Sequence, residues 1–279
     1  MARDLEARIA ANNTPAQQRP ATLADQIKSM EQQFQMAMPK GMEAAQLVRD
    51  ALTALRQTPK LAECTPQSVL GGLMTCSQLG LRPGVLGQAY LLPFWDKRQG
   101  GQVAQVVIGY HGLVELAHRS GKIQSLIART VYENDHFDVD YGLADKLVHK
   151  PYMGGDKGQP IAYYAVAKFT TGGHAFFVMS HPEMLEYRDK HAKARNRNGQ
   201  VFGPWADNFE AMAHKTCVRQ LSKWMPKSTE LATAISADET VRVDLAPDAI
   251  NYGQHPDGDS APEHVDGEIV DDQTEEASA

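Results

Sequence analysis

Apolar residues recur at helical intervals in the first third of the chain. One helix is indicated by the sequence of apolar positions Leu23, Ile27, Met30, Phe34 and Met38. Thr22 stands where an N-cap is expected, with Asp25 at the acidic position of a capping box. A second helix is predicted over residues 45–55. A third is predicted from Thr65–Pro66 to a C-terminal glycine at Gly80.

The middle of the chain has strand-like runs. Residues 88–95 and 102–110 predict a β-hairpin, and 161–169 with 174–179 predict a second one. Between the hairpins, a short helix over 112–120 and a strand over 122–132 are expected. Ser180 is expected to cap a further helix, and helices over 207–225 and 229–235 follow. The pattern predicts an α+β fold with N-terminal helices, a central core of β-hairpins and one long basic helix.

The stretch from Gly80 to Gly121 contains the first hairpin and is the most informative part of the chain. Trp95 lies just before its polar tip, which carries Lys97 and Arg98. An aromatic ring beside two cations suits a polyanion with flat bases. His111 and Arg119, at the two ends of the short helix, are further candidates for contact with such a polyanion, although a structural histidine is the more common case.

Charge and polarity together divide the chain into three parts. Residues 236–279 hold thirteen acidic residues and one basic residue, whereas residues 1–235 hold 27 Lys and Arg against 21 Asp and Glu. Residues 1–20 are polar, and both termini are predicted to be disordered. The predicted organisation is a disordered segment 1–20, a core over 21–235 and a disordered acidic tail over 236–279. The tail either only keeps the chain soluble, or competes with nucleic acid for the basic core or binds a partner.

The helix predicted over 207–225 has two different sides. Phe209, Ala213, Cys217, Leu221 and Trp224 form its apolar side. Lys215, Arg219 and Lys223 are each four residues apart and form a cationic stripe, which suits a phosphate backbone. An ordinary solvated face explains such a stripe about equally well.

A second basic cluster precedes this helix. It comprises Arg188, Lys190, Lys193, Arg195 and Arg197, and Trp205 separates it from the stripe. Cations interleaved with aromatic residues suit single strands, whose bases stack while their phosphates pair with lysine and arginine. The rival interpretation of Trp205 is a core anchor beneath the start of the helix.

Several classes of protein lack support. The chain has no Gly-x-x-x-x-Gly-Lys-Ser/Thr loop for ATP and no hydrolase or zinc-protease motif. Asp135, Asp138 and Asp140 could form a metal site, although a turn between strands explains them better. No window reaches the about 18 apolar residues of a membrane span. Three unpaired cysteines and the lack of a secretory signal predict a cytoplasmic protein.

The order and spacing of several motifs from about residue 25 to 235 resemble the RecT family of phage and prophage single-strand annealing proteins. The motifs are Gly80-Leu-Arg-Pro-Gly84, Tyr90-Leu-Leu-Pro-Phe94, Ile108-Gly-Tyr-His-Gly-Leu113, Arg119-Ser-Gly121, Val131-Tyr-Glu-Asn-Asp135, His149-Lys-Pro151, Pro204-Trp205 and Met212-Ala-His-Lys-Thr216. One departure is His111, where we expect a lysine in many members of the family.

The resemblance implies ATP-independent binding of single-stranded DNA, annealing of complementary strands and strand exchange. It implies a homo-oligomer on DNA, as a ring or a helical filament, in the cytoplasm of a bacterial host. Its expected partners are single-stranded and annealed duplex DNA, an exonuclease and the host single-stranded-DNA-binding protein. No cofactor and no bond chemistry are expected, and Mg²⁺ is left open as a modulator of DNA binding.

We expect the DNA to be held by cations and aromatic rings of the hairpin, the short helix and the basic region. The expected DNA-binding residues are Trp95, Lys97, Arg98, His111, Arg119, Lys190, Lys193, Arg195, Arg197, Trp205, Lys215, Arg219 and Lys223. Two alternatives remain at this point. One is a metal-dependent nuclease that uses the three aspartates, and the other is a structural adaptor that recruits recombination partners through the acidic tail.

Overall fold

A computed structural model describes residues 21–84, 86–97, 100–192, 195, 198–238, 240–242 and 244–247. The fold mixes helices and strands, as predicted. Its helical elements are α2 (Leu23–Ser29), α3 (Glu31–Ala37), α4 (Ala44–Gln57), the 3-10 helix η1 (Pro59–Glu63), α5 (Pro66–Leu79), α6 (Tyr110–Arg119), α7 (His181–His191), α8 (Pro204–Asp207), α9 (Phe209–Leu221) and α10 (Thr229–Ala237). Its strands are β1 (Ala89–Asp96), β2 (Gly101–Ile108), β3 (Ile123–Tyr132), β4 (His136–Asp140), β5 (Lys146–Lys150), β6 (Pro160–Phe169) and β7 (His174–Ser180).

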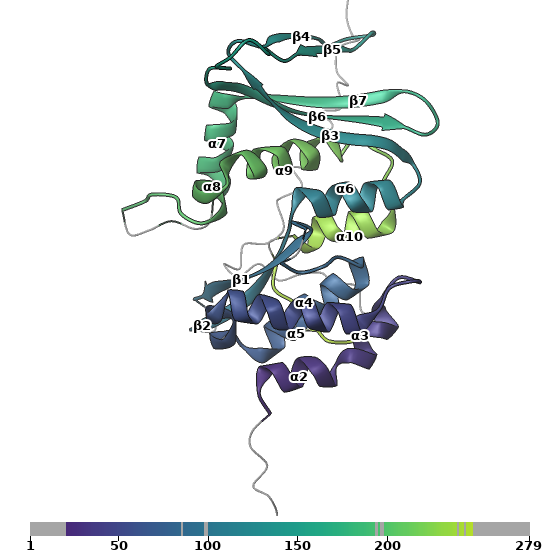
Figure 1. Ribbon diagram of the computed structural model, residues 1–279, viewed down its shortest axis with the longest axis vertical. Coiled ribbons are helices and arrows are strands. Elements are labelled where there is room, and N and C mark those ends of the chain that lie inside the picture. The colour runs from purple at the N-terminus through teal and green to yellow at the C-terminus, as the bar shows by residue number, and fades with distance from the viewer. Residues whose placement is uncertain are drawn as a thin grey trace, which may run out of the picture.

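The N-terminal helices form one end of the molecule (Figure 1). Thr22 and Asp25 make the predicted capping box at the start of α2. The single helix expected here is divided at Met30, whose backbone leaves the helical region (φ −87°, ψ 1°), so that α2 and α3 are separate. The division does not change the apolar face, because Ile27 and Phe34 are both fully buried.

Helix α5 is the centre of this end of the molecule. Pro66 begins it, and Gly80 ends it in the left-handed conformation (φ 59°), as predicted. Gly72 lets the β1–β2 hairpin approach closely, since a Cβ atom there would lie 2.5 Å from Leu91 Cδ2. The two glycines at 71–72 therefore serve packing, which offsets their low helix propensity.

Strands β1 and β2 pair antiparallel from Ala89–Ile108 to Asp96–Gly101, as the hairpin signal predicts. Pro93 lies opposite Ala104 in β1, an edge strand, where its missing N–H leaves no ladder bond unmade. The chain then turns directly into α6, which connects this hairpin to the second half of the fold.

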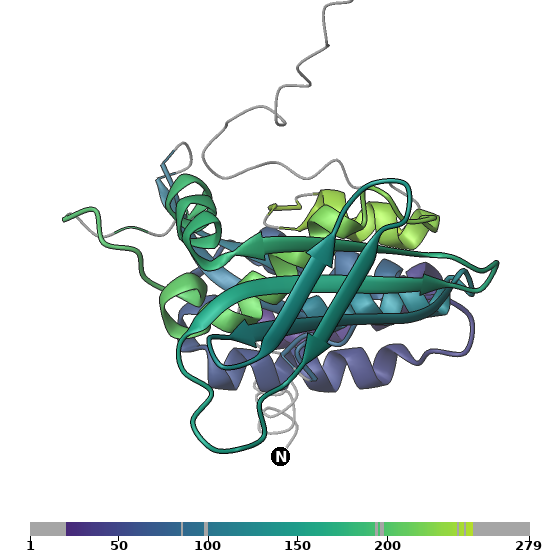
Figure 2. The same cartoon turned by 90° about the horizontal axis from the view of Figure 1, so that it is seen from above.

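The second half is a three-stranded antiparallel sheet of order β3-β6-β7. Helix α9 packs against one face of it, and the two-stranded β4–β5 hairpin crosses the other (Figures 1 and 2). The sequence did not predict β4 and β5 as a hairpin, because the exposed alternate residues of β4 are acidic and read as a turn. Phe137 and Leu147 of that hairpin pack on a small separate core of Val131, Ala162 and Tyr164.

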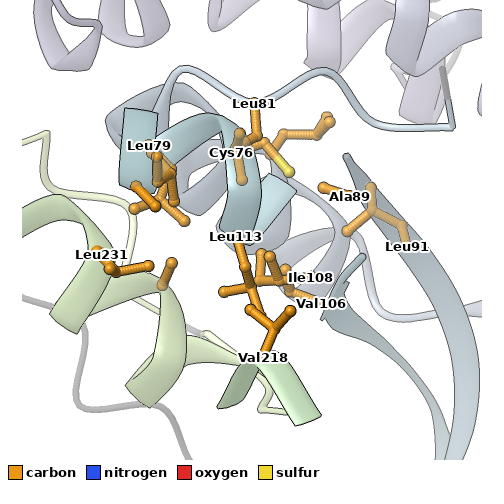
Figure 3. Close-up of a cluster of buried hydrophobic side chains, with 14 of the residues drawn as sticks. Cys76, Leu79, Leu81, Ala89, Leu91, Val106, Ile108, Leu113, Val218 and Leu231 are labelled. Carbon is orange, nitrogen blue, oxygen red and sulfur yellow. The ribbon is translucent and has the colours of Figure 1, made fainter. Parts of the chain in front are cut away.

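One hydrophobic core joins the two halves. Figure 3 shows residues from β2, α6, α9 and α10 converging around Ile108, Leu113 and Val218. Because α10 packs on α5, β2 and α6, and α6 in turn packs on β3 and α9, the hairpin and the sheet are connected through these two helices. This arrangement determines which surfaces lie on the same side of the molecule.

The core continues past the predicted boundary at residue 235. Helix α10 extends to Ala237, and Asp238, Thr240 and Arg242 are buried. The backbone N–H of Val106 in β2 donates to Thr240, 3.0 Å away. Residues just beyond 235 thus pack on the core, a contact that the acidic composition of the tail did not indicate. The disorder predicted for 1–20 falls outside the described residues, as does that for 248–279.

Within the described part of the chain, no helix combines the length and apolar character that crossing a bilayer requires.

Candidate nucleic-acid interface

The tip of the β1–β2 hairpin is exposed. Trp95 has 54% of its surface accessible and lies opposite Gln102, and Lys97 follows it at the turn, also exposed. Arg98 lies outside the described residues. An exposed indole and an exposed lysine thus stand two residues apart at the hairpin tip, residue types that suit base stacking and phosphate pairing.

His111 is exposed in the first turn of α6. Its ring centroid is 3.9 Å from that of Tyr110. The loop before β1 runs close by, since a Cβ atom at Gly87 would lie 3.2 Å from His111 Cδ2. The glycines at 87 and 109 are therefore architectural: they let the loop pass over the start of α6 and leave the histidine at the surface.

Arg119, at the other end of α6, has a structural role. Its guanidinium donates to the carbonyl oxygens of Leu79 (2.7 Å) and Gly80 (3.2 Å), and it pairs with Glu115 at 3.4 Å. The last carbonyls of a helix lack partners within it. Arg119 supplies the missing hydrogen-bond donors at the end of α5. Its placement therefore favours a role in linking α6 to α5 over contact with DNA.

The cationic stripe predicted on α9 is only partly open to solvent. Lys215 is 3% exposed, and its Nζ lies 2.9 Å from Asp238 Oδ1. Arg219 Nη1 donates to the other oxygen of Asp238, and the N–H of Ile108 donates to Oδ1 at 2.7 Å. Burial of Lys215 does not favour the prediction that it contacts DNA, and its counter-charge comes from a segment that was predicted to be disordered. Lys223 lies beyond the end of the helix and is exposed.

The basic cluster before α8 is only partly described. Lys190 is exposed near the end of α7, and Lys193 and Arg197 lie outside the described residues. Arg195 is exposed, and its guanidinium donates to the carbonyls of Gly199 (2.8 Å) and Asp189. These bonds hold the loop that leads from α7 toward α8 and leave part of the guanidinium surface open to solvent.

Trp205 is the core anchor of this region. It is 8% exposed, and its ring packs edge-to-face on Phe209 at 5.7 Å and against Tyr187 at 6.2 Å. Stacking of a base on this indole would require the helices to separate. The expectation that Trp205 stacks on DNA therefore does not fit its position.

Sequence reasoning missed a line of rings that connects α6, α9 and the sheet. We call Tyr110, His111, Tyr163, His181 and His214 the aromatic–histidine seam. Tyr110 lies 5.8 Å from His214, which lies 6.4 Å from Tyr163, and the hydroxyl of Tyr163 is 2.9 Å from His181 Nδ1. Two motifs contain Tyr110 and His214, but spacing along a chain cannot show that residues 104 positions apart meet.

Burial favours the neutral forms of two groups in the seam, His214 and Tyr163. Burial lowers the pKa of His214, although the Glu210 carboxylate opposes this change. Burial, helped by the same carboxylate, raises the pKa of Tyr163 to about 12. Thr130 Oγ1 donates to Glu210 at 2.6 Å and lies 3.0 Å from His214 Nε2. At His214 and Tyr163 the seam therefore favours flat, uncharged rings.

The three aspartates proposed as a metal site do not form one. Asp135 accepts the N–H groups of Tyr132 (2.9 Å) and Tyr152 (2.7 Å), and its other neighbour is His149 Nε2 at 3.0 Å. Burial opposes its ionisation, but these donors outweigh burial and lower its pKa to about 2. Asp138 and Asp140 are exposed on β4. No cluster of three potential metal ligands occurs among the residues that the structure describes.

Comparison with known proteins agrees with the motifs. The model of the RecT family matches residues 45–251. Protein RecT of Escherichia coli (strain K12) is 40% identical over 233 residues, covering 81% of this chain and 84% of that protein. The uncharacterized protein YqaK of Bacillus subtilis (strain 168) is 27% identical over 241 residues, covering 85% and 80%. With a family match over most of its length and a relative at this identity, the chain belongs to the RecT family.

Proposed function

We propose that this protein binds single-stranded DNA and anneals complementary strands without ATP, as a homo-oligomer on the DNA. Membership of the RecT family over residues 45–251 is the observation that carries this proposal, because it supports a role in recombination and strand annealing. The exposed Trp95 and Lys97 supply a surface of suitable chemistry.

The primary DNA site, in this proposal, lies on the side of the molecule that carries the β1–β2 hairpin and the α7–α8 region, at the left in Figures 1 and 2. Lys97, Lys190 and Arg195 pair with phosphates, which are the same in every sequence. Trp95 stacks on a base, and every base has a face on which an indole can stack. Such a site binds strands of any sequence, as an annealing protein requires.

His111 and Tyr110 extend this site toward the interior. Their ring centroids are 3.9 Å apart with the ring planes tilted by 34°, and the Tyr110 ring lies edge-on to that of His214, 5.8 Å away. We assign to His111 contact with the sugar–phosphate backbone by hydrogen bonding. Lys215, Arg219, Arg119 and Trp205 are assigned to the fold rather than to DNA.

Annealing requires no bond chemistry, so a catalytic centre is not part of the proposal. Phosphate neutralisation removes the repulsion between two strands, and base edges left open to solvent can then pair. Mg²⁺ would act only by screening the same phosphates. An exonuclease that generates the single strands and the host single-stranded-DNA-binding protein are the proposed partners.

A fluorescence assay with two labelled complementary oligonucleotides tests the function. In the absence of ATP, the protein should accelerate duplex formation and leave both strands at full length on a gel. Mg²⁺-dependent shortening of the strands would instead support the nuclease alternative. Failure to bind either strand at low salt would support an adaptor and contradict the proposal.

A further inference from the structure

An exposed tryptophan and three exposed lysines lie together where α9 ends. We call Lys122, Lys223, Trp224 and Lys227 the α9-end patch. Trp224 has 78% of its surface accessible, more than Trp95, and the three lysines are also exposed. The sequence pattern placed Trp224 on the apolar side of a long helix, whereas α9 has already ended at Leu221.

The turn after α9 holds this indole outward. The N–H of Trp224 donates to the carbonyl of Leu221 at 3.0 Å, and the adjacent Met225 is buried, at 6% exposure. Met225 therefore anchors the turn in the core and directs its neighbour to solvent. The turn therefore presents a large aromatic ring to solvent beside cations, a combination that suits a ligand with flat bases.

The patch is built from two segments that are fixed to each other. Lys122 Nζ, at the start of β3, donates to the carbonyl of Lys227 at 3.1 Å. This bond joins the 223–227 turn to the α6–β3 connection. The first turn of α10 adds one carboxylate, Glu230, and Glu115 of α6 is paired with Arg119. The patch thus combines a surplus of positive charge with an exposed aromatic ring.

The α9-end patch is separate from the primary DNA site. Figures 1 and 2 both place the connection between α9 and α10 at the right-hand end of the sheet, opposite the β1–β2 hairpin and the α7–α8 region. A single strand of DNA that lies across the β1–β2 hairpin would have to pass around the molecule to reach the α9-end patch of the same subunit. A cation-and-indole surface at each end indicates two places for a polyanion with stacking bases.

We infer that the α9-end patch binds a second single strand of DNA, with Trp224 stacked on a base and the lysines on phosphates. This inference rests on the proposed function, since annealing requires two strands on one assembly. Holding the incoming strand on a different face from the first raises its local concentration without covering the bases that must pair.

The test separates second-strand capture from first-strand binding. The variant Lys223→Ala/Trp224→Ala should bind one labelled strand within twofold of wild type and anneal about tenfold more slowly, because loss of one stacked base costs roughly 1–3 kcal/mol. The matched control Tyr141→Ala/Lys146→Ala removes an exposed aromatic ring and an exposed lysine from the β4–β5 hairpin. It should leave the annealing rate unchanged.

A direct readout uses the fluorescence of Trp224. In the Trp95→Phe protein, Trp224 is the exposed indole and Trp205 is buried. After one strand has been added in an amount that fills the primary site only, adding a second, non-complementary strand should quench the emission, and Trp224→Phe in this background should abolish the quenching.

Three outcomes would overturn the inference: no quenching by the second strand, an equal loss of first-strand binding in the double variant, or a wild-type annealing rate in that variant. If the wild-type protein binds DNA but does not anneal it, the proposed function fails. Second-strand quenching of Trp224 would then still support a second binding site.

Discussion

At the scale of single residues, the most informative side chain is Asp238. Its carboxylate is fully buried and accepts hydrogen bonds from Lys215, Arg219 and the N–H of Ile108. It thereby ties α9 and the end of β2 to the segment after α10. A buried ion pair of this kind contributes little as a pair, but removal of one partner leaves the other charge uncompensated.

Asp238→Asn should therefore lower the free energy of unfolding by about 3 kcal/mol, because Lys215 would remain buried without a counter-charge. Thermal unfolding followed by circular dichroism measures this change. Asp140→Asn, on the exposed side of β4, is the matched control and should unfold like wild type. If Asp238→Asn is as stable as wild type, the network does not have the structural role that we assign to it.

For the hairpin tip we predict the opposite: its variants should lose affinity for single-stranded DNA without losing stability. Trp95→Ala should weaken single-strand affinity by about 1–3 kcal/mol, and Lys97→Ala should reduce the slope of log K against log salt by about 0.7. Fluorescence anisotropy with a labelled oligonucleotide at several salt concentrations measures both changes. Lys215→Ala/Arg219→Ala serves as the comparison. If this double variant folds and its salt dependence is weaker than that of the Lys97→Ala protein, our assignment of buried and exposed cations is contradicted.

At the scale of elements, the β4–β5 hairpin depends on Asp135. This carboxylate links the turn before β4 to His149 in β5 and to the N–H of Tyr152. Its pKa is about 2 in the folded protein, below the ordinary value of 3.8. A lowered folded-state pKa gives stability that is present above the unfolded value and is lost as pH falls through the folded one.

Asp135→Asn should therefore destabilise the protein at pH 7, and the difference from wild type should shrink between about pH 4 and pH 2. Denaturant titrations across that range measure it, with amide exchange of β4 and β5 as a local readout. Asp138→Asn, exposed on the same strand, should show no such trend. A difference that stays constant with pH would show that the ionised carboxylate is not what holds the hairpin.

Local chemistry made many elements predictable from sequence. The Thr22–Asp25 capping box, the left-handed Gly80 and the polar tip between β1 and β2 each have short-range signals. Contacts between distant segments have none. The pairing of Lys215 with Asp238 depends on how the chain returns after α10, and the outward turn of Trp224 depends on burial of Met225. Both were read from helical periodicity alone, which cannot show where a helix ends or what faces it.

The residues predicted to bind DNA fall into an exposed group and a buried group, because contacts between distant segments decide which side chains stay at the surface. Trp95, Lys97, Lys190 and His111 are at the surface, as their positions beside turns and helix ends suggest. Trp205 and Lys215 are buried because other segments of the chain pack against them. Composition identifies a basic region, but only the fold separates the cations that face solvent from those that neutralise internal carboxylates.

At the scale of the whole molecule, described residues between 238 and 247 pack on the core. Arg242 Nε donates to the carbonyl of Asp244 (2.6 Å) and Nη2 to that of Ala246 (2.9 Å), and the Arg242 backbone lies against Gly71 of α5. The described residues in this range, 238, 240–242 and 244–247, therefore belong to the folded unit. A truncation that removes them would confuse loss of the tail with damage to the core.

A chain ending at Pro247 should unfold at the same temperature as the full-length protein, whereas one ending at Ile235 should be several kcal/mol less stable, since it lacks Asp238 and Arg242. Differential scanning calorimetry compares the two.

If the acidic tail competes with DNA for the basic core, the chain ending at Pro247 should also bind single strands more tightly than the full-length protein at low salt, and equally at high salt. Equal stability of both truncations would place the boundary at 235 after all.

The annealing rate tests the central claim most directly. Two complementary labelled strands are mixed with saturating protein in EDTA and without nucleotide, and energy transfer between the labels reports duplex formation. The account predicts a rate well above that of the free strands for wild type, intact strands on a gel, and a rate at least tenfold lower for Trp95→Ala/Lys97→Ala at the same protein concentration. A wild-type rate equal to that of the free strands, or a full rate in the hairpin variant, would contradict it.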